Sequence, residues 1–335
     1  LTSAFTYVHL PPIEEFELAT AAIFDLGVFL TVLGAVMLML YSLSFIPSIG
    51  VSWWFADGEL DEFLISFGIT AVSGILLWLP MRQGRTELTV RDGFLVVTLF
   101  WLILSVAGSL PFLFGIHLDF TDALFESISG FTTTGSTVID GIDRLPPSIL
   151  YHRQQIQWLG GMGVIVLAVA VLPLLGIGGM QLYRAETPGP VKDSKLTPRI
   201  AKTAKSLWLI YLIITVLCAL SYWAAGMDVF DAVCHSFSTV AIGGFSTHDA
   251  SVGIFDSAAI EYVAIVFMLV AGVNFSLHFL AWERIRISLP LEIRGWRPRL
   301  RARRRSFSAT GAFRHYAQDS EFHAYVRILA ALALV

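Results

Sequence analysis

The sequence predicts an all-α integral membrane protein that is built from repeated membrane–loop–membrane units, two of them complete and a third begun. Composition is the first reason, because 56% of the 335 residues are hydrophobic and only 14% are charged, whereas about a quarter are charged in soluble domains. Long apolar runs are the second reason. The third is an internal repeat, in which a short polar segment lies between two apolar runs.

Apolar runs of about 20 residues are long enough to cross a bilayer as helices. We expect spans at residues 21–49, 63–81, 94–114, 156–177, 207–225 and 262–281, and an unfinished one at 324–335. Asp25 lies in the first run, where a carboxylate is costly unless it is paired or near the interface. Because Asp25 is close to the start of the run, we interpret it as interfacial. Cys218 and Cys234 form no CxxC motif and are interpreted as small packing residues.

The internal repeat pairs residues 119–137 with residues 228–246 at a constant offset of 109 and without a gap. The identical positions include Asp119 and Asp228, Ser127 and Ser236, and the glycines near the end of each copy. In the first copy, Asp119 or Thr121 can cap a short helix over residues 122–129, because an Asp or Thr oxygen accepts N–H groups of a first turn. The polar, glycine-rich residues that follow are tolerated at membrane depth only beside protein or a water-filled cavity.

These loops have the composition of a re-entrant pore hairpin. Gly135 and Gly244 accept positive φ, so that successive carbonyl oxygens can turn toward an axis and replace the hydration shell of K⁺ or Na⁺. The negative C-terminal ends of the short helices would also favour a cation. The alternative is that both loops only cap a helical bundle, with the two glycines at ordinary positions after a helix. The gapless repetition favours the pore.

Charge predicts the orientation of the spans. If the runs cross the membrane in alternating directions, all but Arg144 and Arg153 of the 22 basic residues lie on one side. The positive-inside rule makes that side cytoplasmic and predicts a multi-pass protein of the cell inner membrane with cytoplasmic basic loops. The opposite loops are acidic, which would either attract cations to the pore mouth or have no effect beyond solvation.

From residue 31 onward the sequence resembles the TrkH/KtrB superfamily of Trk-type potassium uptake transporters, which have four membrane–pore–membrane repeats around one axis. The resemblance rests on LFWLILSVAGSLPFLF, FESISGFTTTGST, RQQIQWLGGMGVIVLAVAVLPLLGIGGMQLYRAETPGP and HSFSTVAIGGFSTHDAS. It implies permeation of K⁺ without an enzyme reaction or a cofactor. It also implies a selectivity filter made of two loops, with K⁺ as the only metal: loop one is Thr132, Thr133, Thr134, Gly135 and Ser136, and loop two is Ala241, Ile242, Gly243, Gly244 and Phe245.

Four pore-helix residues complete the predicted site: Asp122, Glu126, Asp231 and His235. His235 occupies the position that matches Glu126 in the repeat, and is interpreted as a hydrogen-bonded packing residue before an ion ligand. Both are weak candidates for a proton relay, which a symport mechanism would need. Asn274 and His278 are four apart and therefore on one helical face, toward either the pore or a neighbouring helix.

Three glycines in Gly160-Gly161-Met162-Gly163 weaken the span after loop one by roughly 1 kcal/mol each relative to alanine. They either allow close packing between membrane helices or seat a filter loop against the span. Metal and catalytic sites are not expected, since no HExxH, Cys/His or Ser-His-Asp pattern is present.

The resemblance divides the chain and implies partners. A basic linker and an Arg-rich insertion are expected to face the cytoplasm, where they either meet membrane lipid or contact a TrkA-like ring of nucleotide-binding regulatory subunits. The insertion is alternatively only a disordered linker. Nucleic acid is not expected, because no base-reading fold accompanies the arginines. The segments are an N-terminal segment at 1–30, a helix pair at 31–92, the first repeat at 93–183, the linker at 184–206, the second repeat at 207–282, the insertion at 283–320 and the start of a third repeat at 321–335.

Two features depart from the family. Residues 1 to about 30 are similar to the tail of MrpA/MrpB-type subunits of sodium/proton antiporters, which suggests a fusion or, as an alternative function, an accessory antiporter subunit. The chain also ends inside the third repeat, so that the resemblance implies a truncated transporter or an inert fragment. Two loops would leave an ion half coordinated, and a homodimer would supply four.

Overall fold

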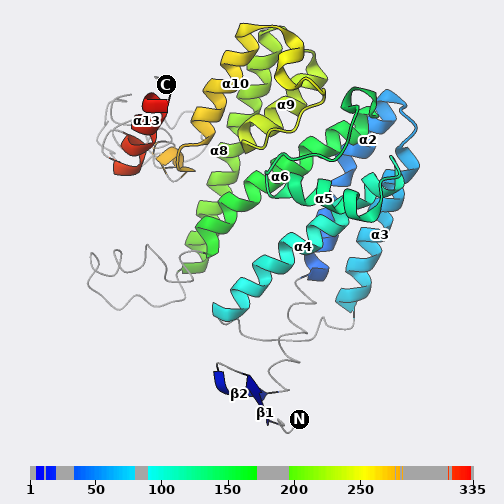
Figure 1. The fold of residues 1–335 in the computed structure, drawn as a ribbon, viewed down its shortest axis with the longest axis vertical. Helices are drawn as coiled ribbons and strands as arrows, with labels where there is room; N and C mark the ends of the chain where they lie inside the picture. Colours follow the sequence, from blue (N-terminus) through cyan, green and yellow to red (C-terminus); the bar gives the residue numbers. More distant parts are fainter. Residues whose placement is uncertain are drawn as a thin grey trace, which may run out of the picture.

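The structure, a computed structural model, describes residues 5–10, 13–19, 34–79, 90–171, 196–275, 277–279, 281, 316 and 319–332. Within these ranges, only the backbone is described for residues 5–10, 13–19, 90–100, 164–171, 196–204, 321 and 332. Asp25, most of the predicted linker at 184–206 and most of the predicted insertion at 283–320 lie outside the described residues. The helical membrane fold that the sequence predicts is confirmed (Figure 1).

The first two membrane helices form an antiparallel pair. Residues 34–42 are helical and lead through a turn into α2 (Phe45–Phe55), and α3 (Leu60–Trp78) follows. Within the described residues, three segments are long and apolar enough to cross a membrane: Gly34–Phe55, Leu60–Trp78 and Lys205–Ala224. The first span therefore continues six residues past the predicted end at residue 49. Polar Asp57 and Glu59 follow it and end the apolar run.

The first repeat consists of α4 (Val90–Phe114), the short helix α5 (Phe120–Phe131) and α6 (Pro147–Val171). The helix that contains the apolar run predicted from residue 156 begins nine residues before that run. Pro147 suits a first helical position, where its missing N–H is not needed. The Asp57 carboxylate accepts a hydrogen bond from the Ser148 N–H at 2.9 Å and so satisfies a first-turn donor.

The second repeat consists of α8 (Leu196–Ala224), the short helix α9 (Val229–Ala241) and α10 (Ala258–Ala271). Because α8 begins at Leu196, the end of the predicted linker is helical. The continuous span predicted at 262–281 is wrong, because α10 ends at Ala271 and residues 272–274 are not helical. Side chains bind the carbonyl groups at this break: Tyr325 of α13 (Ser320–Leu332) donates to the Leu269 oxygen at 3.1 Å, and a ring nitrogen of His278 lies 2.9 Å from the Val270 oxygen.

Each repeat has its own hydrophobic core, and α6 lies between the two. The first core joins buried residues of α2, α4, α5 and α6, such as Phe45, Phe112 and Ile156. The second joins α8, α9 and α10 through residues such as Tyr211 and Ala264, with Trp158 of α6 packed against it. Figure 1 shows α6 running between the α2–α5 group and the α8–α10 group. The helix that follows loop one is thus positioned to contact both predicted filter loops.

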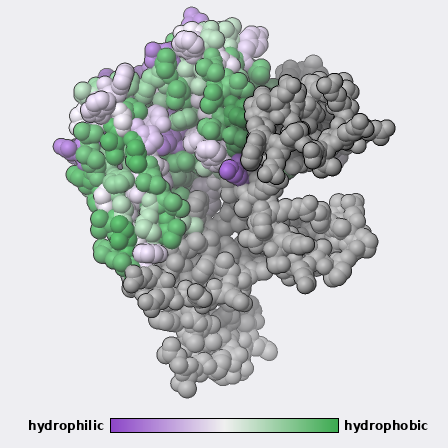
Figure 2. All heavy atoms as spheres, turned by 180° about the vertical axis from the view of Figure 1, so that it is seen from behind, coloured by the Kyte–Doolittle hydropathy of each residue, from purple (hydrophilic) through white to green (hydrophobic). Residues whose placement is uncertain are grey.

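The outer surface of the described helices is strongly apolar. Large side chains of α3, including Leu64, Ile69 and Leu76, are exposed by 42% to 62%. Figure 2 shows that hydrophobic residues cover most of the coloured part of one face. A contiguous apolar surface of this kind is not stable when exposed to water and marks a site of contact with another protein or a membrane. We therefore expect these side chains to contact lipid.

The N-terminal segment adds two strands that the all-α prediction did not include. Strand β1 (Phe5–Leu10) pairs antiparallel with β2 (Ile13–Ala19), with Phe5 opposite Ala19 and an irregularity between Val8 and Leu10. Alternating residues such as Val8 and Phe16 suit a pleated strand. The membrane fold described above involves neither strand.

Candidate functional site

The two short helices α5 and α9 are related by the repeat. Asp119 and Asp228 precede them with nearly the same backbone angles, φ −60° and ψ 150° against φ −58° and ψ 154°. The Asp228 side chain accepts a hydrogen bond from the Phe230 N–H, as expected for a cap, whereas Asp119 makes no side-chain cap. Helix α5 extends two residues beyond each end of the range 122–129 that the sequence predicts for the first copy. In the second copy Ala241, predicted in loop two, is the last residue of α9.

The backbone of loop one recurs in loop two. Thr133 and Ile242 both have φ of 54°, and Gly135 and Gly244 have φ of 76° and 86°. The hydrogen bonds recur as well: Thr134 N–H donates to Ser129 and Gly243 N–H donates to Ser238, both at 2.9 Å. All these pairs keep the offset of 109, so that the repeat in sequence is also a repeat in backbone conformation. A non-glycine residue at positive φ is uncommon, and its recurrence at the same place indicates a defined loop.

The two loops touch each other. A Cβ atom added to Gly135 would lie 1.9 Å from the Gly243 carbonyl oxygen, so that only glycine allows this approach. A Cβ atom added to Gly244 would meet no atom within 4 Å. The side chains of Thr132, Thr134, Ser136 and Ile242 are exposed. Loop two is fixed from behind by Gln157 of α6, whose Oε1 accepts the Phe245 N–H at 3.1 Å. The loops thus form one polar surface that is supported by α6.

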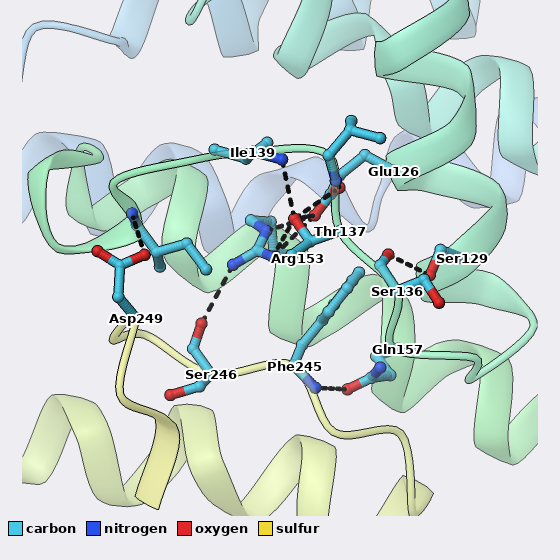
Figure 3. A network of polar contacts seen from close by, with 12 residues as sticks. Glu126, Ser129, Ser136, Thr137, Ile139, Arg153, Gln157, Phe245, Ser246 and Asp249 are labelled. Atoms are coloured by element: carbon cyan, nitrogen blue, oxygen red, sulfur yellow. Dashed lines mark hydrogen bonds and ion pairs between the residues drawn. The ribbon is translucent and has the colours of Figure 1, made fainter. Parts of the chain in front are cut away.

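A buried ion pair lies behind loop one. Arg153 of α6 and Glu126 of α5 are both fully buried, and their charged groups are 2.8 Å apart. Thr137 donates to the Glu126 carboxylate at 3.0 Å and accepts from Arg153 Nη2 at 3.2 Å. Arg153 Nη1 also donates to the carbonyl oxygen of Ser246, directly after loop two, at 3.1 Å. Figure 3 shows the guanidinium between Thr137 and Ser246.

In the second repeat, His235 occupies the position that corresponds to Glu126. His235 is buried, and its Nδ1 and Nε2 lie 2.9 Å from the Asp231 carbonyl oxygen and 3.0 Å from the Ser246 hydroxyl. Both ring nitrogens of His235 thus have hydrogen-bond partners, which agrees with its interpretation as a hydrogen-bonded packing residue. Asp231 accepts from Thr247 at 2.8 Å, whereas Asp122, its partner in the repeat, is exposed. Glu126 and His235 therefore occupy matching positions with different chemistry. Glu126 binds the hydroxyl group of Thr137, directly after loop one, and His235 binds that of Ser246, directly after loop two.

His248 joins the segment after loop two to the segment after loop one and to α9. Its Nδ1 lies 2.7 Å from Asp143, and its Nε2 lies 3.2 Å from Asp231. The His235 ring stacks nearby, and Asp249 accepts the Ile142 N–H at 2.9 Å. Partial burial disfavours the imidazolium, but the hydrogen bonds and charges of the two carboxylates outweigh this effect and raise the pKa of His248.

We expect the His248 bridge to strengthen as the pH falls. Because folding raises the pKa of this residue, its stabilising contribution is complete below the unfolded pKa of about 6.5 and is lost as the pH rises through the higher folded pKa. His248→Gln should lower the melting temperature in detergent by about 2 °C near pH 5.5 and by little near pH 9. His117→Gln, at an exposed histidine, is the control. An effect of His248→Gln that does not depend on pH would contradict the bridge.

The glycines of α6 seat the ends of both short helices. A Cβ atom on Gly160 would lie 2.0 Å from the Phe131 carbonyl oxygen at the end of α5, and one on Gly161 would lie 3.0 Å from Ala241 at the end of α9. The structure thus supports both proposed uses of these glycines, close packing of helices and seating of the filter loops. The backbone of α6 closely approaches the ends of α5 and α9, where the two loops begin.

Sequence reasoning missed Arg153 and Gln157 as parts of the site. Arg153 precedes the apolar run predicted at 156–177 and Gln157 is at its start, and the structure buries both in α6. The spacing of Arg153, Gln157 and Gly160 at three and four residues places them on one helical face and could have indicated their shared direction. His278 contacts the hydroxyl of Tyr316 at 2.7 Å and the Val270 carbonyl, which favours the neighbouring helix over the pore.

Comparisons with known proteins identify the family of this arrangement. The sequence model of the TrkH family, described as a cation transport protein, matches residues 59–296. A domain related to the MnhB subunit of Na⁺/H⁺ antiporters matches residues 1–38, which confirms the predicted resemblance of the N-terminal segment. The family description is that of a transporter and not of an enzyme, as the sequence predicts.

Relatives of known name are close in sequence. The Trk system potassium uptake protein TrkH of Halomonas elongata is 53% identical over 313 residues, which are 93% of this chain and 59% of that protein. The protein of the same name from Escherichia coli K12 is 54% identical over 250 residues, 74% of this chain and 52% of that protein. The crystal structure of the potassium transporter TrkH from Vibrio parahaemolyticus superimposes with a TM-score of 0.75 at 44% identity, covering 91% of this chain and 58% of that one. The chain therefore spans between about half and three fifths of the length of these relatives.

Proposed function

This chain belongs to the TrkH family of cation transport proteins, and we propose that it acts in potassium uptake as the membrane subunit of a Trk-like system. In this proposal, partly dehydrated K⁺ passes the backbone carbonyl groups of loop one and loop two. The names of the relatives cited above support potassium as the ion. They also favour this role over that of an accessory antiporter subunit, for which the support is the match at residues 1–38.

The observation that carries the proposal is the repeated backbone of the two loops. Positive φ at Thr133 and Gly135 recurs at Ile242 and Gly244, and the Gly135 backbone contacts the carbonyl group of Gly243. Two separate caps of a bundle would need neither the same conformation nor mutual contact. Loops that supply carbonyl oxygens to one ion must lie close to a common axis, and the repeated conformation and the contact favour that arrangement.

Orientation and partners follow from the same proposal. The basic loops lie in the cytoplasm, and the acidic outer loops, including Asp143 and Asp249, face the opposite side of the inner membrane. There they raise the local concentration of cations. A TrkA-like ring of nucleotide-binding subunits binds the cytoplasmic side. Pairing of two chains brings four loops around one axis, and cross-linking in the membrane that finds only monomers would remove this part of the proposal.

Rubidium uptake tests the proposed function. Purified chain is reconstituted into lipid vesicles, and uptake of labelled rubidium, a potassium analogue, is compared with that of empty vesicles. The proposal predicts uptake above the empty control, with unlabelled potassium competing more strongly than sodium. Vesicles that contain folded chain but take up no rubidium would contradict it for this chain.

A further inference from the structure

We propose that Arg153 is a positioning residue that holds loop one and loop two in a fixed relation and thereby sets the discrimination between cations. The inference rests on the proposed function. Its basis is that one guanidinium reaches the residue after each loop: Thr137 through Nη2 at 3.2 Å and the carbonyl group of Ser246 through Nη1 at 3.1 Å. The Phe245 ring of loop two also lies over this guanidinium, 4.4 Å away.

Stability alone does not account for this ion pair. The side chains of Arg153 and Glu126 are both fully buried, and burial of two charges carries a desolvation penalty that their attraction often fails to exceed. Apolar residues of similar volume would hold α5 and α6 together at least as well. The pair is, however, suited to directing hydrogen bonds, because the planar guanidinium presents its donors in a rigid fork.

The second repeat has no equivalent cation. The position that matches Arg153 at the offset of 109 is Tyr262, which is 69% exposed. His235 binds the Ser246 hydroxyl in place of a Glu–Arg pair and does not reach loop one in the contacts described here. Within the described site, Arg153 therefore bridges the C-terminal ends of both loops. The bridge between Asp143 and His248 and the hydrogen bond from Ile142 to Asp249 join them farther out.

The position of this bridge connects it to ion selection. Thr137 directly follows Ser136, the last residue of loop one, and Ser246 directly follows Phe245, the last residue of loop two. A change in the separation of these two residues moves the carbonyl oxygens of both loops relative to each other. Discrimination between K⁺ and Na⁺ depends on the size of the cavity or on the number of carbonyl groups that reach the ion, and either quantity changes with that separation.

The test separates positioning from charge balance. Glu126→Gln/Arg153→Met removes both charges together, so that no unpaired charge is buried, but it also removes the hydrogen bonds to Thr137 and Ser246. Arg153→Lys keeps the charge opposite Glu126 and loses the planar fork. Arg144→Gln removes an exposed arginine from the outer loop and is the matched control.

Hydrogen exchange measured by mass spectrometry reports on the loops without any transport. We expect the amides of residues 241–247 to exchange at least about tenfold faster in the double variant, because the loss of one charge-assisted hydrogen bond changes an equilibrium by about this factor. Residues 132–138 should also exchange faster in the double variant. In Arg153→Lys, we expect faster exchange of residues 241–247 with residues 132–138 less affected. Unchanged exchange of residues 241–247 in Arg153→Lys and in any folded double variant would overturn the bridge.

Rubidium uptake in the presence of sodium tests the effect on selectivity. The preference for rubidium over sodium should fall by about tenfold in the double variant and in Arg153→Lys, and should be unchanged in Arg144→Gln. A folded double variant or Arg153→Lys with wild-type selectivity would overturn the positioning role. Absence of uptake by the wild-type chain would contradict the proposed function and the selectivity role with it, whereas the exchange experiment would still decide whether Arg153 bridges the loops.

Discussion

Gly135→Ala is expected to abolish rubidium uptake while the protein remains folded. The added Cβ atom would lie 1.9 Å from the Gly243 carbonyl oxygen, and both are backbone positions that cannot rotate away. Gly135 also has φ of 76°, where an L-residue is strained by about 1–2 kcal/mol. The two loops must therefore separate. A displacement of about 1 Å in a positioned group can lower a rate about hundredfold, and we expect a loss of uptake of at least that size.

Gly141→Ala is the matched control for backbone strain. Gly141 has φ of 74°, close to that of Gly135, but the nearest atom to an added Cβ atom is in the Arg144 side chain at 3.9 Å. Both variants should lose a similar amount of stability from backbone strain, Gly135→Ala should lose more because of the contact with Gly243, and only Gly135→Ala should lose uptake. Equal uptake in the two variants would show that contact between the loops is not required for transport.

Gly160→Ala is expected to separate α6 from the end of α5. The added Cβ atom would lie 2.0 Å from the Phe131 carbonyl oxygen and 2.7 Å from its carbon. Overpacking of a core typically costs about 1–3 kcal/mol, and more where backbone must move. We expect a loss of about 3 kcal/mol, measured as a lower midpoint of chemical denaturation in detergent, together with a loss of uptake because loop one begins at Thr132.

Gly50→Ala is the matched control for this second variant. Gly50 lies within α2, and an added Cβ atom meets nothing within 4 Å. Alanine is favoured over glycine in a helix by about 1 kcal/mol, so that this variant should be as stable as the wild-type chain or slightly more stable. A Gly160→Ala protein that unfolds at the wild-type midpoint would contradict the close approach of α6 and α5.

The repeat allowed the sequence to predict the most regular part of the site. Glycines at matching positions indicated positive φ at Gly135 and Gly244, and the structure has it at both. The prediction succeeded because local chemistry determines this feature: a glycine after a short helix is the residue that accepts such a conformation without strain. Contact between the loops was not predicted, since it depends on how α6 packs.

Features that depend on tertiary contacts escaped the sequence. Arg153 was placed on the side opposite the basic loops because it precedes the apolar run predicted from residue 156, and the partner that allows its burial, Glu126, lies 27 residues away. The break after Ala271 was missed because the carbonyl groups before it are satisfied by side chains, and one of these, Tyr325, is 56 residues away in sequence from the Leu269 that it binds, while His278 is eight residues from Val270. Asp122 and Asp231 match in the repeat but differ in exposure, because only Asp231 lies beside His248.

The most direct measurement is the location of rubidium in an experimental structure of this chain that is determined in rubidium chloride. The anomalous scattering of rubidium distinguishes it from water and sodium. The account predicts a rubidium peak that is coordinated by backbone carbonyl oxygens of both loop one and loop two, beside Gly135 and Gly244. A rubidium site that involves neither loop, with both loops ordered and free of the ion, would contradict the account.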